Sequence, residues 1–274
     1  MDGEAPNRMG IIGTGRLGQA MARTAARASP ASSSRPGRPG GPREAMRIDV
    51  AENGPYHVSG SVPLSVQTIA TNAAGESIDW REGRTFETDR EYNLCRCGRS
   101  ANKPFCDGSH ERVRFDGTET ASREAYQAQA GEEDGPNVIL TDAESLCAYA
   151  RFCDVGGSVW RLVQRRDEAS TALAIGEATR CPSGRLVAWD RRTREPHEPD
   201  LRPSISLVED PAAGVSGPLW VKGGISIVSA DGVEYENRNR VTLCRCGASQ
   251  NKPFCDGTHA SIGFDDGLDD LSTS

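Results

Sequence analysis

The sequence has few aromatic residues and no long apolar run. Aromatic side chains make up 5% of its 274 residues and apolar side chains 36%, which limits the chain to one or two small hydrophobic cores. No segment is long and apolar enough to be a transmembrane helix. The net charge of −7 argues against nucleic acid, whose phosphates attract basic surfaces. The composition therefore predicts a cytoplasmic protein that binds neither membrane nor nucleic acid.

Lysine is also scarce. Lys103, Lys222 and Lys252 are the only lysines among 32 basic residues, so arginine carries nearly all the positive charge, as is typical of bacteria with GC-rich genomes. Signatures of substrate chemistry are missing too, because there is no Ser-His-Asp pattern, phosphate loop or paired-carboxylate signature. We therefore expect that the protein is not an enzyme.

A sixteen-residue segment, in contrast, occurs twice. It reads CRCGRSANKPFCDGSH at residues 95–110 and CRCGASQNKPFCDGTH at residues 244–259, with only three differences. Each copy supplies three thiols and one imidazole with the spacing C-x-C-x8-C-x3-H. Such a ligand set can surround a soft metal centre. The repeat therefore predicts two metal sites.

Two kinds of metal centre compete for these ligands. Structural zinc often has three cysteines and a histidine, but its modules usually begin with C-x2-4-C and enclose the ion tetrahedrally. The C-x-C pair of this chain would let Cys95 and Cys97 hold one iron of a cluster. Cys106 and His110, one helical turn apart, would hold a second iron. The spacing therefore favours an iron–sulfur cluster over zinc.

These residues resemble the CDGSH iron–sulfur family, whose pattern is C-x-C-x2-[ST]-x3-P-x-C-D-G-[STA]-H. The resemblance implies that each copy binds one 2Fe-2S cluster. The implied ligands are Cys95, Cys97, Cys106 and His110 in the first copy, and Cys244, Cys246, Cys255 and His259 in the second. Around them we expect Lys103 and Lys252 to place positive charge near a reduced cluster, with two solvated surface lysines as the alternative. Asp107 and Asp256 are expected beside the clusters as caps of the following helical turn.

Three further cysteines lie between the two copies. Cys147 and Cys153 stand in CAYARFC, and Cys181 begins CPSG. A bacterial ferredoxin has C-x2-C-x2-C and a remote Cys-Pro, and this segment lacks only the middle cysteine, where Ala150 stands. The segment resembles divergent monocluster ferredoxin-like domains. The resemblance implies a 3Fe-4S cluster on the three thiolates, or a 4Fe-4S cluster with a non-cysteine fourth ligand. Loss of the cluster, with three free or buried thiols, remains an alternative.

The local pattern around these cysteines predicts two helices. Thr141 and Glu144 form a capping box before a short helix that would carry Cys147 and Cys153. Residues 169–180 predict a second helix that ends at Cys181, whereas residues 159–166 are basic and strand-like.

The fold expected from these patterns is a β-rich α+β fold. Alternating apolar residues after Gly54 and after Gly217 predict strands. We expect two CDGSH β units with cluster-binding loops, paired as a pseudo-dimer within one chain, and a small ferredoxin-like α/β segment between them. The expected boundaries are 46–120 for the first unit, 121–136 for a polar linker, 137–205 for the ferredoxin-like segment and 206–274 for the second unit.

Residues 1–45 are expected to lie outside these units. Gly13, Gly15 and Gly18 form a G-x-G-x-x-G, which would bind a dinucleotide within a βαβ unit. Residues 29–45 are mostly Ser, Pro, Gly and Arg, and this composition cannot build the rest of such a unit. We therefore interpret residues 1–45 as a disordered or non-native extension, with Met46 as a natural start.

These features favour a role in single-electron transfer or in redox and pH sensing. Storage of iron–sulfur clusters, or their delivery to apo-proteins, is the alternative, and a third hypothesis is an electron-transfer subunit of an oxidoreductase. The expected partner is a reductase, whose basic surface would suit this acidic chain, or an apo-protein that accepts a cluster. We expect a monomer with an internal pseudo-dimer, or a weak homodimer.

Overall fold

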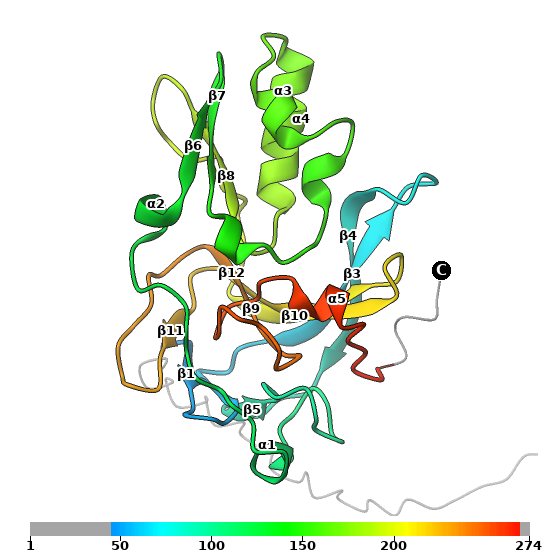
Figure 1. The fold of residues 1–274 in the computed structure, drawn as a ribbon, viewed down its shortest axis with the longest axis vertical. Coiled ribbons are helices and arrows are strands. Elements are labelled where there is room, and N and C mark those ends of the chain that lie inside the picture. The colour runs from blue at the N-terminus through cyan, green and yellow to red at the C-terminus, as the bar shows by residue number, and fades with distance from the viewer. Residues whose placement is uncertain (1–44, 269–274) are drawn as a thin grey trace, which may run out of the picture. The chain divides into compact units, whose positions relative to one another are not determined.

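The computed structural model describes residues 45–268, which form a β-rich α+β fold with three sheets (Figure 1). The glycine motif at residues 13–18 and nearly all of the predicted extension at residues 1–45 lie outside the described residues. Within residues 45–268, no helix is both long enough and apolar enough to cross a bilayer.

Two of the sheets lead into the repeated segments, which directly follow one strand of each sheet. The first has the strand order β11-β1-β2-β5, with β1 (Arg47–Val50), β2 (Tyr56–Ser59), β5 (Tyr92–Leu94) and β11 (Ser226–Val228). The second has the order β12-β10-β9-β3-β4, with β3 (Leu64–Thr71), β4 (Ser77–Phe86), β9 (Ser204–Asp210), β10 (Val215–Lys222) and β12 (Arg240–Leu243). The strands predicted after Gly54 and Gly217 are therefore confirmed.

Each of these sheets includes strands from both halves of the chain. Strand β11 of the second half pairs in parallel with β1 of the first half, with Ile48 opposite Ile227. In return, β3 of the first half pairs in parallel with β9 of the second half, with Leu64 opposite Ile205. These pairings bury one shared apolar cluster, in which Ile48, Leu64 and Ile205 have at most 2% of their surface exposed. Neither half completes its sheet alone.

The third sheet belongs to the middle segment. It contains β6 (Gly131–Asp134), β7 (Val138–Asp142) and β8 (Leu186–Asp190), and α3 (Val159–Val163) and α4 (Glu168–Arg180) contribute to its apolar core. The predicted helix at residues 169–180 is confirmed as α4. Asp167 caps this helix, because its side chain accepts a hydrogen bond from Ser170 N at 2.8 Å.

Two local predictions in this segment are wrong. Residues 159–163 form α3 and no strand, because Val159, Leu162 and Val163 have helical spacing and are all buried in the core shared with α4. Thr141 lies in β7 and caps no helix, since its hydroxyl bonds to the buried Tyr126 hydroxyl at 2.8 Å. No helix carries both cysteines: Cys147 directly follows a short 3-10 turn, Glu144–Leu146, and Cys153 lies within a second one, Phe152–Asp154.

The segment at residues 121–136 also differs from the linker that its polar composition predicts. It contains α2 (Tyr126–Gln129) and the edge strand β6, which pairs with β7. The Tyr126 side chain is buried and donates to Thr141 O and Arg185 O at 3.0 and 2.8 Å. One buried aromatic residue with polar partners thus fastens this polar stretch to the third sheet.

Candidate metal centres

The first site begins at the end of β5 and ends in α1 (Ser109–Arg112). The sulfur atoms of Cys95 and Cys97 are 3.8 Å apart, and the Cys106 sulfur is 3.3 Å from Nδ1 of His110. The pKa of Cys95 is lowered to about 6 by the neighbouring Cys97 thiol and by the backbone N–H groups of residues 98–100. A lowered pKa favours the thiolate, which is the form that binds metal.

The second site repeats this geometry between β12 and α5 (Thr258–Ser261). The sulfur atoms of Cys244 and Cys246 are 3.6 Å apart, and the Cys255 sulfur is 3.3 Å from Nδ1 of His259. The pKa of Cys244 is likewise lowered to about 6, first by the Cys246 thiol and then by backbone N–H groups. Both sites therefore bring together all four ligands that the sequence predicts.

The ligands of each site form two pairs, which fits a cluster of two irons. No group of three or more His, Cys, Asp or Glu side chains in residues 45–268 is arranged to hold a single metal ion. The two pairs are nevertheless neighbours. The pKa of Cys106 is raised mainly by burial, and the charge of Cys95 in the other pair adds to this increase. The donor set, three thiolates and an imidazole in two pairs, suits two linked irons.

The turns of the two sites approach each other closely. A Cβ atom added to Gly98 would lie 2.6 Å from Cys246 O, and one added to Gly247 would lie 2.6 Å from Cys97 O. Any other residue at these positions would collide with the backbone of the other site. The Tyr56 hydroxyl of the first half also donates to Cys244 O at 2.7 Å. These contacts hold the two C-x-C turns against each other.

The residue between the first two cysteines is a buried arginine in both sites. Arg96 donates to Ala51 O and Gly117 O at 3.2 and 2.6 Å. Arg245 donates to Gly217 O at 2.7 Å and forms ion pairs with the buried carboxylates of Glu209 and Asp266. Sequence reasoning missed these supporting arginines. Both copies have arginine between the first two cysteines, and this shared residue could have indicated the supporting role.

The predicted neighbours of the ligands bond to the motif backbone. Lys103 Nζ donates to Ser100 O at 2.9 Å, and Lys252 Nζ donates to Ser249 O at 2.7 Å. The Asp107 carboxylate accepts from Ser109 N and Ala101 N, both at 2.9 Å, and Asp256 accepts from Thr258 N and Gln250 N at 3.0 and 2.7 Å. The aspartates thus join the turn before the histidine to the loop after the C-x-C pair. A direct role of these four residues toward a cluster stays a prediction.

The three remaining cysteines line one cavity, together with Ala150 at the position of the missing cysteine. Burial raises the pKa of Cys153 to about 12, with contributions from the charges of Asp154, Cys181 and Cys147. Two side-chain oxygen atoms lie beside these thiols. Ser183 Oγ is 3.5 Å from the Cys181 sulfur, and an Asp154 carboxylate oxygen is 4.0 Å from the Cys153 sulfur. Three thiolates facing one cavity fit the ligand set of a cubane-type cluster that has a non-cysteine fourth ligand.

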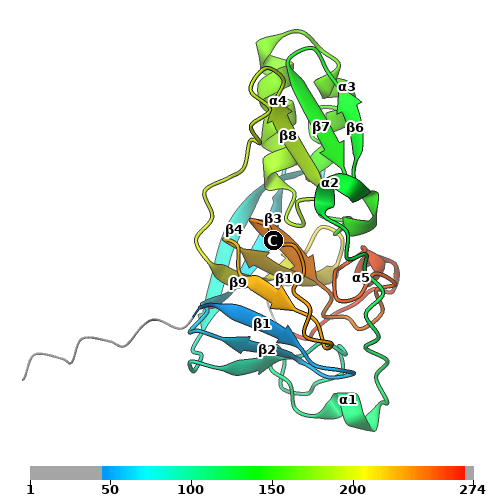
Figure 2. The ribbon, with the colours of Figure 1, turned by 90° about the vertical axis from the view of Figure 1, so that its left-hand side faces the viewer.

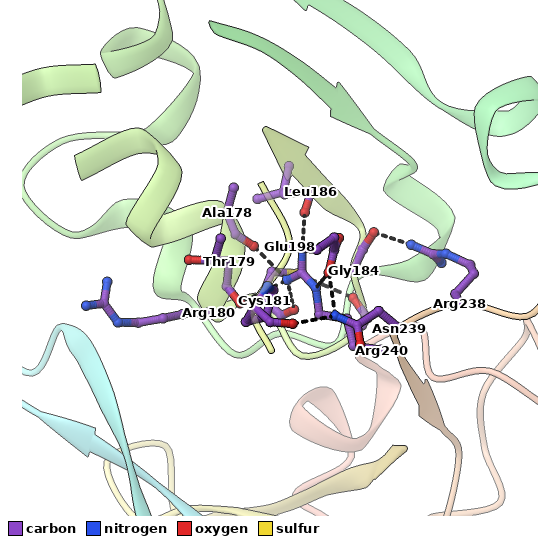
Figure 3. A network of polar contacts seen from close by, with 12 residues as sticks. Ala178, Thr179, Arg180, Cys181, Gly184, Leu186, Glu198, Arg238, Asn239 and Arg240 are labelled. Carbon is purple, nitrogen blue, oxygen red and sulfur yellow. Dashed lines mark hydrogen bonds and ion pairs between the residues drawn. The ribbon is translucent and has the colours of Figure 1, made fainter. Parts of the chain in front are cut away.

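A buried arginine fastens this middle segment to the strand that leads into the second site (Figure 3). Arg240 of β12 is 1% exposed and donates to the carbonyl oxygens at the end of α4, including Ala178 O at 2.8 Å and Cys181 O at 2.6 Å. Its charge is paired with Glu198, at 2.9 Å. Because the last carbonyls of a helix lack partners within the helix, Arg240 satisfies them. It thereby links Cys181 to the strand before Cys244.

Comparison with protein families finds a match over each of the three segments that contain these residues. Residues 53–111 and 216–260 match the family described as iron-binding zinc finger CDGSH type. Residues 133–191 match the family described as divergent 4Fe-4S mono-cluster. A comparison with curated proteins finds no match. The chain therefore contains two CDGSH-type segments, which are 2Fe-2S-binding, and between them a divergent 4Fe-4S mono-cluster domain.

Proposed function

We propose that this protein carries single electrons between its iron–sulfur sites and a redox partner protein. The observation that carries the proposal is a direct contact between the loop of the mono-cluster triad and the turn of the second CDGSH site. A bound iron–sulfur cluster supplies reversible one-electron chemistry. The protein supplies the ligands and the rigid packing that keeps the sites adjacent.

The contact is made by backbone and by one side-chain amide. A Cβ atom added to Gly257 would lie 3.2 Å from Cys147 O and 3.4 Å from Tyr149 Cβ, so the two turns meet at van der Waals distance. Asn251 Nδ2 donates to Ser145 O at 2.9 Å. The charge of Cys147 also contributes to the raised pKa of Cys255, after burial and nearer charges. Such adjacency favours electron transfer between two sites, whereas storage of separate clusters does not need it.

The two CDGSH segments are proposed to form a pseudo-dimer within the one chain. The support is reciprocal: β11 joins β1 as β3 joins β9, and Gly98 faces Cys246 O as Gly247 faces Cys97 O. Such an arrangement leaves no need for a second chain. Sedimentation of the protein is expected to give a monomer mass, and a stable dimer would contradict this part of the proposal.

An anaerobic reductive titration followed by EPR tests the electron-transfer role. We expect reversible reduction with the iron content unchanged after reoxidation. We also expect magnetic interaction between the second CDGSH site and the mono-cluster site, because their loops touch. Reduction that releases iron, or that cannot be reversed, would refute the role. A ferredoxin reductase is the partner class to test first as electron donor.

Delivery of a cluster to an apo-protein is the second candidate, and the exposure of the first site favours it. Cys106 and His110 are both partly exposed, and His110 faces an open groove lined by Glu52, Glu111 and Arg114. Incubation with an apo-ferredoxin separates the two functions. Delivery predicts that the colour passes to the acceptor, whereas electron transfer predicts that this protein keeps it.

A further inference from the structure

The two CDGSH sites have the same ligands but differ in their exposure to solvent. His259 is buried, with 4% of its surface exposed, whereas His110 is only partly buried. The last cysteine of each site differs in the same direction, because Cys255 is 2% exposed and Cys106 is only partly buried. The half of each site formed by the last cysteine and the histidine is therefore open in the first copy and closed in the second.

The difference arises at the turn between that cysteine and the histidine. A Cβ atom added to Gly108 would meet nothing within 4 Å among the described residues, whereas the same atom on Gly257 would meet Cys147 and Tyr149. The far ends of the two helical turns remain alike, since Val113 and Ile262 are 50% and 51% exposed. At this turn, therefore, only the second copy has a neighbour, and its helix α5 in addition packs against β10.

The covering element is the loop Ser145–Tyr149 of the mono-cluster domain. Asn251, in the loop after the second C-x-C pair, donates to Ser145 O, whereas the equivalent Asn102 of the first site is exposed. Figures 1 and 2 agree in placing α5 beside the mono-cluster domain, with α1 at the opposite end of the described region. The Arg240 network in Figure 3 fixes this domain against β12. The loop is thus bonded to the second site by Asn251, and its domain is bonded to β12 by Arg240.

We propose that the loop Ser145–Tyr149 encloses the second CDGSH site, so that chelators and partner proteins in solution reach the first site and not the second. The two sites then have different tasks: the first exchanges with partners, and the second is retained inside the protein next to the mono-cluster site. The inference rests on cluster binding at both sites, but it holds whether the first site exchanges electrons or whole clusters.

A chelator challenge of the iron-loaded full-length protein tests this inference. Bipyridine and N-ethylmaleimide are added together, so that each thiol freed by loss of iron is alkylated. Mass spectrometry of the peptides then gives the rate of alkylation for Cys106 and for Cys255. We expect Cys106 to react several-fold faster. Equal rates, or faster reaction of Cys255, would overturn the proposal.

Two variants test whether the loop causes the difference. Asn251→Ala removes the hydrogen bond to Ser145 O and should speed alkylation of Cys255 by about two- to ten-fold, the effect of one lost hydrogen bond on an opening equilibrium. Asn102→Ala is the matched control and should leave both rates unchanged. Tyr149→Gly removes the side chain whose Cβ faces Gly257, at a position whose φ of 55° glycine adopts without strain, so it should also speed alkylation of Cys255.

The outcomes separate this inference from the proposed function. If neither Asn251→Ala nor Tyr149→Gly changes the Cys255 rate relative to Asn102→Ala, the loop does not enclose the site. If the order of alkylation is as expected but the protein cannot be reduced reversibly, the enclosure stands and the electron-transfer role fails. Iron and sulfide counted before the challenge establish that both sites start occupied.

Discussion

Replacing Glu177 by glutamine is expected to make the stability of the protein less sensitive to alkaline pH. Glu177 lies on α4 with 1% of its surface exposed. Neither of its carboxylate oxygens has a hydrogen-bond partner among the described residues. Burial raises its pKa from 4.5 to about 8, and the charge of Asp154 adds to the effect. The side chain is therefore protonated in the folded protein at neutral pH.

The sign of the pH effect follows from proton binding. Between pH 4.5 and about 8 the unfolded chain has an ionised Glu177 and the folded chain a protonated one, so the folded state binds more protons and its stability falls as the pH rises. Each pH unit of increase inside this window lowers the free energy of unfolding by about 1.4 kcal/mol. From pH 6 to pH 8, the wild-type protein should lose about 2 kcal/mol relative to Glu177→Gln.

The assay is urea unfolding of both proteins at pH 6 and pH 8, with equal cluster content and with tryptophan fluorescence as the probe. From pH 6 to pH 8, the unfolding midpoint of the wild type should fall relative to that of Glu177→Gln. Glu168→Gln, at the exposed first turn of the same helix, should follow the wild-type profile and serves as the control. Parallel profiles for wild type and Glu177→Gln would refute the reasoning, because they would mean that Glu177 is ionised in the folded protein.

Three further predictions concern the arginine turns, the polar stretch and the mono-cluster site. Arg245→Ala should lower the free energy of unfolding by about 3–5 kcal/mol, because it leaves the fully buried carboxylates of Glu209 and Asp266 without their partner. Urea unfolding should show a smaller loss for Arg96→Ala, because Arg96 bonds to carbonyl oxygens. Tyr126→Phe should cost about 1–2 kcal/mol through the lost hydroxyl bonds while the iron content stays unchanged, so loss of iron would show that α2 supports a metal site. Iron analysis should find about eight irons in the wild-type chain and about four in Cys181→Ser, as expected for two 2Fe-2S clusters and one 4Fe-4S cluster. About seven irons in the wild-type chain would indicate a 3Fe-4S cluster. About four irons in both proteins would mean that the middle triad holds no cluster.

The ligand sets could be predicted because their chemistry is local. Cys95 to His110 spans one C-x-C turn and one helical turn, so spacing alone indicates which side chains can meet, and the structure brings all four together in both copies. The helix α4 was equally predictable from its own residues. The α3 segment was not, because its short apolar pattern suits strand or helix until α4 supplies a partner. Thr141 failed as a helix cap for a similar reason, since β8 and Tyr126 engage it first.

The two CDGSH ligand sets and the three thiols between them could thus be predicted from the sequence, since each depends on residues close together in the chain. What surrounds these residues depends on the tertiary structure. The exchange of β3 and β11 between the two halves, the carboxylates that meet Arg245 and the loop that faces Gly257 all join residues far apart in the sequence. Two nearly identical motifs therefore have different exposure, because burial is set by the packing of distant segments and not by the spacing of the ligands.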